Sequence, residues 1–530
     1  MTSFFGTDGI RGQTTLEHMS ENDAIASFFE KRQLHPHIFR LLGEAIGLNL
    51  DLFPGEKNTI IIGWDERPAN DQFAKQLTIG LHLYGCEIIH APITSTPVLH
   101  GLVLESNARL GCMITASHNP VSDTGVKLFD AHGMKTLPER ETYLSSVMIQ
   151  LSAEERPVEV EDVQELSKPK RSISQIESIE FHQQWLLHRI KHWASLSTQE
   201  AHLQIHKPLK VDSSRGSAHV WLSDFLERLG HPSEEVSSSA NALNEQCGAG
   251  ELSPGDYWSI EDAKTSRHAL IQSLEYTEPR TIVGVAIDGD GDRCFLIETT
   301  DHGFRVLDGD MMVSMILQHH SHMNWLVATS IESDLEFVQY ISNLNPQNKT
   351  VETAVGDRWL GHMLMPSRGD CSSEFEVLGV EDSGHLVMAS STINQHHSLV
   401  GDGIATMLRC LKFGSQVPDF LQGKKLRVSI SNPHRSRWNP TSKIFDVCLQ
   451  TCTNMLTQLG FKTLQRAIEG ESSLLFLEFS NQDGKGTIGI RNSGTQEKTN
   501  LSIRLSQGLD LNTFKPLVEE LQSILIDGFA

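Results

Sequence analysis

Three carboxylates stand close together in the segment DGDGDR at residues 288–293, directly after an apolar run. The glycines let the backbone curl tightly, so the oxygens of Asp288, Asp290 and Asp292 can converge on one point. A cluster of hard oxygen ligands that leaves room for a phosphate oxygen suits Mg²⁺. The segment therefore predicts a magnesium site at the end of a buried strand.

Other interpretations of this segment are weaker. An EF-hand would need glycine where Arg293 stands and glutamate where Thr299 stands. A phosphatase with Asp288 as its nucleophile would have Thr or Val in place of Asp292. A bare acidic surface turn is disfavoured, because three like charges repel one another without a cation.

A second segment, TASHNP at residues 115–120, also follows an apolar run, and its Ser117 stands where a nucleophile could face a cleft. The chain has no Gly-x-Ser-x-Gly elbow, which argues against a hydrolase triad. Taken alone, the segment could be a simple turn before proline. Two features favour a phosphoserine: His118, if protonated, and Lys127 supply positive charge, and a serine phosphate would give the aspartate loop a further oxygen ligand.

Two more polar segments are suited to binding a sugar phosphate. The segment RNSGT at 491–495 combines a guanidinium, two hydroxyls and glycine-exposed amides, which can form a nest for phosphate. The segment EDSGH at 381–385 offers an acceptor, a hydroxyl and an imidazole to sugar hydroxyls. Taken alone, RNSGT is only suggestive, since Ser-Gly-Thr is common in turns, and EDSGH could equally be a polar surface turn.

Elements that could position these segments alternate between strand and helix, which is typical of an α/β fold with parallel or mixed sheets. The expected strands are 59–64, 87–91, 109–115, 209–212, 281–287 and 324–329, and the expected helices are 70–84 and 217–229. The last hundred residues predict a separate α+β domain. It would have strands at 426–431, 475–479, 486–491 and 501–505, and helices at 442–459 and 513–525.

Length and composition indicate a globular protein with three to four domains, because the chain has 530 residues, 39% of them apolar and 21% charged. The net charge of −23 disfavours binding to nucleic acid or to anionic lipid, so neither is expected as a partner. No apolar run reaches about 18 residues, so no membrane helix is expected. The eight cysteines form no C-x-x-C pair, and the first residues lack signal-peptide features. We therefore expect a cytoplasmic protein with reduced thiols.

Taken together, the four segments resemble those of one family, the α-D-phosphohexomutases. The segments FGTDGIRG at 5–12 and TAVGDR at 353–358 add to the resemblance. All six occur in the family's order between residues 5 and 495. Within the family, residues 5–12 and the Glu-x-Ser-Gly-His pattern look most like the bacterial phosphoglucosamine mutases.

The resemblance implies four domains around a central cleft, three related α/β domains and a C-terminal α+β domain, which we expect at 1–160, 161–303, 304–423 and 424–530. It implies an isomerase that moves a phosphoryl group between the 6- and 1-positions of a hexose phosphate through a phosphoserine and a hexose 1,6-bisphosphate. The expected reaction converts glucosamine 6-phosphate to glucosamine 1-phosphate, with glucose or mannose phosphates as the alternative. A sugar phosphatase and an inactive sensing relative remain open but less favoured. The protein would act on this small molecule as a monomer or a homodimer.

The resemblance also implies roles for individual residues. Ser117 would carry the phosphoryl group and complete the Mg²⁺ shell of Asp288, Asp290 and Asp292. The other catalytic residues would be Arg11, His118, Lys127, Arg293 and His385, with Lys127 and His385 as acid/base groups. The substrate-binding residues would be Gly356, Asp357, Arg358, Glu381, Ser383, Arg491, Ser493, Gly494 and Thr495. Thr115 departs from the serine usual in phosphoglucosamine mutases and is more typical of enzymes for glucose or mannose phosphates.

Overall fold

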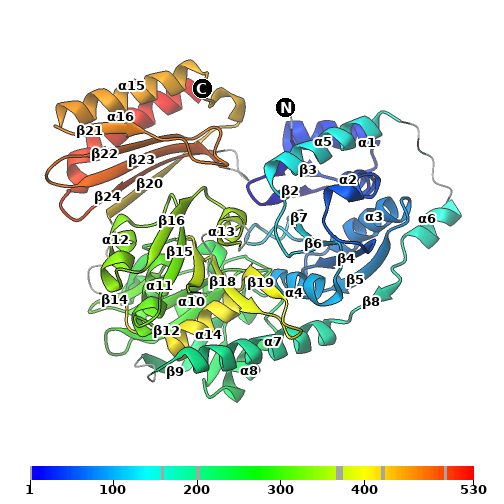
Figure 1. Ribbon diagram of the computed structural model, residues 1–530, viewed down its shortest axis with the longest axis horizontal. Coiled ribbons are helices and arrows are strands. Elements are labelled where there is room, and N and C mark those ends of the chain that lie inside the picture. The colour runs from blue at the N-terminus through cyan, green and yellow to red at the C-terminus, as the bar shows by residue number, and fades with distance from the viewer. Residues whose placement is uncertain are drawn as a thin grey trace.

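The computed structural model describes residues 3–154, 156, 160–198, 203–365, 374–418, 424–493 and 498–529. Four β-sheets, each packed against helices, divide these residues into four domains (Figure 1). We name them by their elements: domain I from β1 to β8, domain II from β9 to β14, domain III from α11 to α14, and domain IV from β20 to α16. The mixed α/β architecture expected from the sequence is confirmed.

Domain I is built on an eight-stranded sheet of order β1-β2-β7-β6-β4-β5-β8, with β3 beside β2. Its strands are β1 (Phe5–Gly6), β2 (Gly9–Thr14), β3 (Gln33–Leu34), β4 (Thr59–Trp64), β5 (Glu87–Pro92), β6 (Leu110–Ile114), β7 (Asp123–Asp130) and β8 (Arg171–Ser172). Its helices are α1 (Glu21–Lys31), α2 (Pro36–Leu48), α3 (Asn70–His82), α4 (Thr96–Ser106) and α5 (Pro138–Ser152), followed by α6 (Val160–Leu166).

The apolar run of β4 is buried on both faces of this sheet, which explains why it does not alternate with polar residues. Ile60 and Ile62 join the core under α2, α3 and α5, while Ile61 packs with α4 on the other face. Strands β4, β5, β6 and β8 are parallel, so their carboxyl ends share one edge. The serine loop that follows β6 therefore leaves the sheet at that edge.

Domain II carries a six-stranded sheet of order β10-β9-β12-β13-β14-β11 and is joined to domain I by α7 (Gln175–Leu196). Its elements are β9 (Gln204–Asp212), α8 (Leu222–Arg228), β10 (Ser233–Glu235), β11 (Tyr257–Ser259), α9 (Ile260–Thr265), α10 (Ala269–Ser273), β12 (Thr281–Ile287), β13 (Cys294–Thr299) and β14 (Gly303–Leu307). Helix α8 begins five residues later than the pattern predicted, because residues 217–221 form turns.

Domain III has a five-stranded sheet of order β16-β15-β17-β18-β19. Its elements are α11 (Gly309–His319), β15 (Trp325–Ser330), α12 (Leu335–Leu344), β16 (Lys349–Thr353), α13 (Asp357–Leu364), β17 (Glu376–Val380), β18 (Leu386–Ser391), β19 (His397–Gly401) and α14 (Gly403–Phe413). One continuous apolar core runs through domains II and III, so the two are packed together as a unit.

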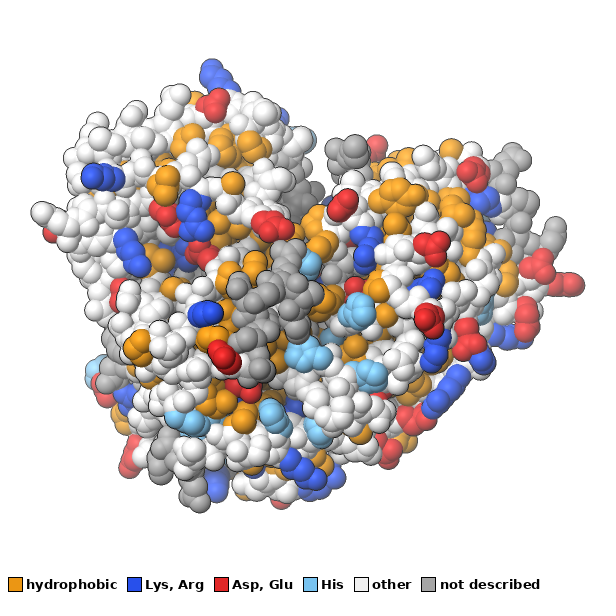
Figure 2. All heavy atoms as spheres, viewed as in Figure 1, with side chains coloured by type: hydrophobic (Ala, Val, Ile, Leu, Met, Phe, Trp, Pro, Cys, Tyr) orange, Lys and Arg blue, Asp and Glu red, His pale blue; other side chains and the backbone are white. Residues whose placement is uncertain are grey.

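Domain IV is an antiparallel sheet of order β20-β24-β23-β22-β21 with two helices on one face (Figure 1). Its elements are β20 (Lys424–Ser431), α15 (Lys443–Gln458), β21 (Lys462–Gln465), β22 (Leu475–Ser480), β23 (Lys485–Asn492), β24 (Lys498–Leu505) and α16 (Leu511–Phe529). This domain has its own core. On the face viewed in Figure 2, a notch separates domain IV from domain I.

Two strands differ in position from the domain borders expected from the sequence. The border between residues 303 and 304 falls inside β14, which pairs with β13 in the sheet of domain II. Residues 171–172 form β8, which extends the sheet of domain I beyond residue 160. Strand pairing with distant partners decides both positions, and the local composition does not record it. Among the described residues, no helix has the length and apolar character needed to cross a membrane.

Candidate active site

Ser117 lies in the loop after β6, at the carboxyl edge of the domain I sheet. Its backbone is left-handed, with φ +49°, and its side chain is buried. The Ser117 hydroxyl accepts a hydrogen bond from Arg11 Nη2 (3.2 Å) and donates one to Asp290 Oδ2 (3.3 Å). The fold thus brings the serine segment and the aspartate segment together across the interface of domains I and II.

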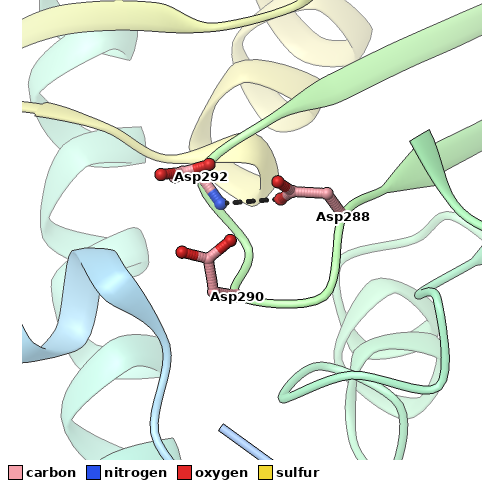
Figure 3. A group of neighbouring side chains, drawn as sticks. All are labelled: Asp288, Asp290 and Asp292. Atoms are coloured by element: carbon pink, nitrogen blue, oxygen red, sulfur yellow. Dashed lines mark hydrogen bonds between the residues drawn. The ribbon is translucent and has the colours of Figure 1, made fainter. Parts of the chain in front are cut away.

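The aspartate loop follows β12, and the carboxylates of Asp288, Asp290 and Asp292 point toward one another (Figure 3). One oxygen from each lies within 4.8 Å of the others. Asp288 Oδ1 accepts the Asp292 amide hydrogen at 3.0 Å. Burial, together with the charges of Asp292 and Asp290, raises the pKa of Asp288 well above its usual value.

Each of these aspartates keeps one buried oxygen that has no hydrogen-bond partner among the described residues: Asp288 Oδ2, Asp290 Oδ1 and Asp292 Oδ1. Three buried, unpartnered carboxylate oxygens in one group are a costly arrangement without a cation. The donor set of hard oxygens fits a divalent metal such as Mg²⁺. The sequence expectation for this loop therefore agrees with the geometry.

Lys127 reaches the same group from β7. Its Nζ lies 2.7 Å from Asp290 Oδ2, 2.6 Å from Asp292 Oδ2 and 3.4 Å from Asp8 Oδ2. Burial alone would lower the pKa of Lys127, but the carboxylates of Asp290, Asp292 and Asp8 outweigh it and raise this pKa well above its usual value. Lys127 is therefore an ammonium that balances part of the aspartate charge.

A pocket of about 170 Å³ opens beside these groups, and all four domains contribute to its lining. The lining residues are Thr7, Asp8, Arg11, His118, Arg293, Glu332, Val355, Gly356, Asp357, Glu381, Ser383, His385, Arg491 and Ser493. Most of the residues that the sequence singled out for substrate contact are in this set. Gly494 and Thr495 lie outside the described residues.

His385 is surrounded by carboxylates in the part of the pocket formed by domain III. Its Nε2 lies 3.4 Å from Asp357 Oδ2 and 3.5 Å from Asp292 Oδ2, and its Nδ1 lies 3.5 Å from Glu381 Oε2. Burial lowers the pKa of His385, but these carboxylates outweigh it, so the pKa is raised. Glu381 is held in turn by the Gly356 amide, which donates to Oε1 at 2.7 Å.

The opposite end of the pocket is cationic and belongs mainly to domain IV. Arg491 and Ser493 stand at the end of β23, and Arg427 on β20 lies nearby. Glu332 of domain III bridges the two arginines, with Oε1 3.4 Å from Arg491 Nη2 and Oε2 2.6 Å from Arg427 Nη2. Burial would raise the pKa of Glu332, but Arg427 and Arg491 lower it overall, so this carboxylate is ionised.

Two sequence expectations need correction. Arg358 does not line the pocket: its Nη1 donates to Glu141 Oε2 (2.8 Å) and Thr136 O (3.0 Å), so it joins domain III to domain I. His118 lines the pocket but does not supply positive charge, because burial and the neighbouring Arg293 and Arg11 lower its pKa well below the usual value. A motif gives the position of a side chain along the chain, whereas its direction depends on tertiary packing.

Several residues beside Ser117 and Asp290 make contacts that the sequence did not indicate. Thr96 donates to Asp290 Oδ2 at 2.5 Å, and the Thr115 hydroxyl accepts from Ser117 N (2.8 Å) while donating to Asp65 Oδ2 (2.7 Å). Asp65 directly follows β4, and Glu332 follows β15 by two residues. A polar residue just after a parallel strand could have identified both, because ligands bind at the carboxyl ends of such strands.

Comparison with known proteins agrees with this geometry. Two domain descriptions of one family match the chain: phosphoglucomutase/phosphomannomutase alpha/beta/alpha domain I over residues 2–154 and domain III over residues 308–426. Together they cover about half of the chain. A phosphoglucosamine mutase of Zymomonas mobilis is 26% identical, with 93% of this chain and 92% of that protein covered. One from Staphylococcus aureus is 25% identical, with 97% and 96% covered.

Solved structures share the fold at low sequence identity. A phosphoglucomutase/phosphomannomutase family protein of Burkholderia thailandensis is 14% identical, with a TM-score of 0.62 and 99% and 97% of the two chains covered. An N-acetylphosphoglucosamine mutase of Aspergillus fumigatus, solved with GlcNAc-6P and magnesium, is 16% identical, with a TM-score of 0.50 and 82% and 93% covered. The chain belongs to the α-D-phosphohexomutase family of isomerases, that is, to the phosphoglucomutase/phosphomannomutase family.

Proposed function

We propose that the protein interconverts the 6- and 1-phosphates of glucosamine, using Ser117 as the phosphoryl carrier. The observation that carries the proposal is the shared carboxylate oxygen: Asp290 Oδ2 accepts from the Ser117 hydroxyl and from Lys127 within one buried group. The pocket beside it carries cationic residues at both ends, which suits a sugar with a phosphate at either end. The two relatives described above, named phosphoglucosamine mutases, support this choice of sugar.

Asp288, Asp290 and Asp292 would hold Mg²⁺, with a phosphate oxygen of phosphorylated Ser117 as a further ligand. When bound there, the ion would offset the negative charge of the phosphoryl group during its transfer. The unpartnered oxygens of these aspartates support the assignment.

The residues around Ser117 align its phosphoryl group and shield it from water. Arg11 donates to the Ser117 hydroxyl and is itself paired with Asp8 at 2.9 Å, so its guanidinium is already oriented. Arg293 lines the same part of the pocket. In phosphoryl transfer most of the catalysis is alignment and charge stabilisation, which is what fixed guanidinium groups provide. Enclosure by four domains limits hydrolysis of the phosphoserine.

The reaction would use the two ends of the pocket alternately. A free hydroxyl of the sugar phosphate takes the phosphoryl group from Ser117 Oγ, which gives a hexose 1,6-bisphosphate. The bisphosphate turns around, and its other phosphoryl group returns to Ser117. In each orientation the distal phosphate would bind Arg491, Ser493, Gly494 and Thr495, while Glu381 and Ser383 bind sugar hydroxyls. We assign Lys127 and His385 to proton transfer: the sugar hydroxyl gives up its proton to His385 as it takes the phosphoryl group, and the ammonium of Lys127 supplies one to Ser117 Oγ.

The alternative substrates are glucose and mannose phosphates. The sequence feature in their favour was Thr115, but its hydroxyl is buried and bonded to Ser117 N and Asp65, outside the pocket lining. A serine hydroxyl could make the same two bonds. Thr115 therefore acts on the loop and has no contact through which it could select a sugar. Sugars that differ in one substituent are separated by only about 1–3 kcal/mol unless a dedicated polar contact exists, so overlapping activity is expected.

A side-by-side coupled assay tests the proposal with the 6-phosphates of glucosamine, glucose and mannose, a trace of hexose 1,6-bisphosphate and Mg²⁺. We expect the highest kcat/KM for glucosamine 6-phosphate, and a glucose or mannose rate well above it would establish the alternative. Free phosphate without isomerisation would establish a phosphatase, and binding without turnover an inactive relative. Intact-mass spectrometry should find one phosphate on Ser117 that monophosphate substrate removes. The matched control is Ser122→Ala, an exposed serine of the same loop, which should leave activity unchanged, whereas Ser117→Ala should be inactive.

A further inference from the structure

The carbonyl oxygens of the serine loop are held from two sides. Ser117 O accepts from Arg67 Nη2 at 2.9 Å and from Asn244 Nδ2 at 2.6 Å. Asn119 O accepts from the same two groups, at 2.9 and 3.0 Å. Arg67 belongs to domain I, and Asn244 belongs to domain II. Two donors from different domains thus bind the same pair of backbone carbonyls.

This arrangement explains how Ser117 keeps its unusual backbone. A non-glycine residue with φ +49° lies in the left-handed region and persists only where its surroundings fix it. Fixing the Ser117 carbonyl fixes the peptide plane that follows the Ser117 Cα, and this limits the directions in which the side chain can present its hydroxyl to Arg11 and Asp290. The two donors on Ser117 O are therefore in a position to aim the phosphoryl carrier.

Asn244 is itself fixed by its own loop. The backbone N–H of Asn244 donates to Ser214 O at 3.2 Å. Asp212 steadies the same loop by accepting from the backbone N–H groups of Ser214 (2.9 Å) and Gly248 (2.8 Å). The side chain is 3% exposed. The side-chain amide of Asn244 faces two carbonyl oxygens, those of Ser117 and Asn119. Because a carbonyl oxygen only accepts hydrogen bonds, Nδ2 and not Oδ1 must be the atom that faces them. Its Oδ1 has no hydrogen-bond partner among the described residues.

The metal loop meets the same point. A Cβ at Gly289 would lie 3.0 Å from Ser117 O and 3.1 Å from Asn244 Nδ2, so a side chain at this position would press on both atoms. The serine loop, the metal loop and Asn244 are thus in mutual contact, although Asn244 itself does not line the pocket.

We propose that Asn244 is a positioning residue through which domain II fixes the direction of Ser117. Its amide nitrogen holds the Ser117 and Asn119 carbonyls in register with the aspartate loop, and Arg67 holds them from the domain I side. The inference rests on the proposed role of Ser117 as phosphoryl carrier. A purely structural role would affect folding alone, whereas a positioning role affects the chemical step and the lifetime of the phosphoserine.

Asn244→Asp tests this inference with little change of shape. Aspartate tolerates the left-handed backbone of this position (φ +57°) but places an acceptor against two carbonyl oxygens. We expect kcat for the hexose phosphate to fall roughly 10²-fold, because a small misplacement of a reacting group has effects of this size. KM should change less than about threefold, since the substrate pocket is untouched. Phosphoserine hydrolysis without substrate, followed by intact mass, should accelerate.

Asn244→Gly is the second variant, because glycine accepts the same backbone and removes both hydrogen bonds without adding a charge. Gln246→Glu is the matched control: Gln246 is exposed, has the same φ of +57°, and lies in the same loop. It should match the wild type in kcat, KM and phosphoserine lifetime. Circular dichroism and melting temperature verify that each variant is folded.

The inference is overturned if Asn244→Asp keeps the wild-type kcat and phosphoserine lifetime, or if it raises KM alone. It is also overturned if Asn244→Asp and Asn244→Gly both fail to fold, because Asn244 then serves stability. If the wild-type enzyme itself transfers no phosphoryl group through Ser117, the proposed function fails, and this outcome is visible before any variant is made.

Discussion

The two ends of the substrate pocket differ in how deeply their interdomain contacts are buried. At the serine end, the contacts between domains I and II are fully buried: Asn244 donates to two backbone carbonyls at 2.6 and 3.0 Å, and Lys127 lies 2.6–2.7 Å from Asp292 and Asp290. At the opposite end, domains III and IV meet through charged side chains. Lys425 lies 3.1 Å from Asp310, and Arg504 lies 3.1 Å from Glu352, while Arg427 is 40% exposed.

The apolar contact between domains III and IV is small by comparison. Ile331, Leu474 and Phe476 form its buried cluster, whereas domains II and III share one extended core. An ion pair near the surface, such as Arg427 with Glu332, contributes little stability and weakens with salt. We infer that the serine end is rigid, whereas the cationic end is adjustable: its side chains change position to fit the phosphate that they bind.

Asp290→Asn changes the rigid serine end and should cause the largest loss of activity. Asp290 accepts from Thr96, Ser117 and Lys127, and an amide is a poorer ligand for a cation. A metal stabilises transferred charge by several kcal/mol, which corresponds to roughly 10³-fold in rate. Turnover measured against Mg²⁺ concentration checks this, with the exposed Asp301→Asn as control. Normal turnover at limiting Mg²⁺ would show that Asp290 is not a metal ligand.

Arg491→Lys changes the adjustable cationic end, where we expect a smaller loss of activity. A lysine keeps the charge but loses the fork of donors that matches a phosphate. Hydrogen bonds to charged groups are worth about 1.5–3 kcal/mol, so kcat/KM should fall roughly 10- to 100-fold, mainly through KM. Steady-state kinetics measures the split. Arg437→Lys, whose guanidinium donates to Phe529 O within domain IV and lies outside the pocket, should behave as the wild type. A fall in kcat alone would place Arg491 at the chemical step.

Salt should separate the two ends without any mutation. Raising KCl from about 0.05 to about 0.5 M shortens the Debye length to a few ångströms and weakens exposed pairs such as Arg427 with Glu332. We expect KM for the sugar phosphate to rise roughly three- to tenfold. The lifetime of phosphoserine in the buried serine end should change much less. Equal changes in both quantities would remove the distinction between the ends.

The sequence predicted the residues whose chemistry is visible locally. Ser117 and the aspartates of 288–292 follow apolar runs that had to be buried strands, and the ends of such strands are where a site forms. Most helix and strand bounds were predicted to within a few residues for the same reason. What the sequence could not supply was contact between distant segments. Asn244 touches the serine loop only because domain II docks there, and nothing in its neighbourhood marks it.

The same limit applies to Arg358 and to the border expected at 303. Arg358 was assigned to substrate by the resemblance of the segment 353–358, yet its guanidinium turns to Glu141 across the interface of domains I and III. The residues on either side of the expected border at 303 both belong to β14, which pairs with β13 through a hairpin that composition does not mark. Both differences concern a direction or a pairing, and neither concerns the identity of an element.

Asp308→Asn should have the smallest effect, on stability alone, and it belongs to the adjustable end. Asp308 caps α11 by accepting from Met311 N at 3.0 Å and lies 3.9 Å from Lys425. Burial raises its pKa to about 7; Lys425 opposes the shift, and the charges of Asp310 and Asp382 add to it. The unfolded chain loses this proton near pH 4, the folded protein only near pH 7.

Between these two values, rising pH therefore stabilises the unfolded chain more than the folded protein, and above pH 7 the loss is constant. Asparagine is an equally good cap but does not ionise. At pH 4.5 the variant and the wild type should unfold at similar temperatures. At pH 8 the variant should be more stable by up to about 4 kcal/mol, since the pKa of Asp308 rises from about 4 to about 7 on folding and each pKa unit corresponds to about 1.4 kcal/mol. Thermal melts between pH 4.5 and pH 8 measure this difference. If the variant were less stable than the wild type at pH 8, the ion pair of Asp308 with Lys425 would outweigh the cost of burying the charge. The contacts between domains III and IV would then be stronger than the exposure of Arg427 suggests.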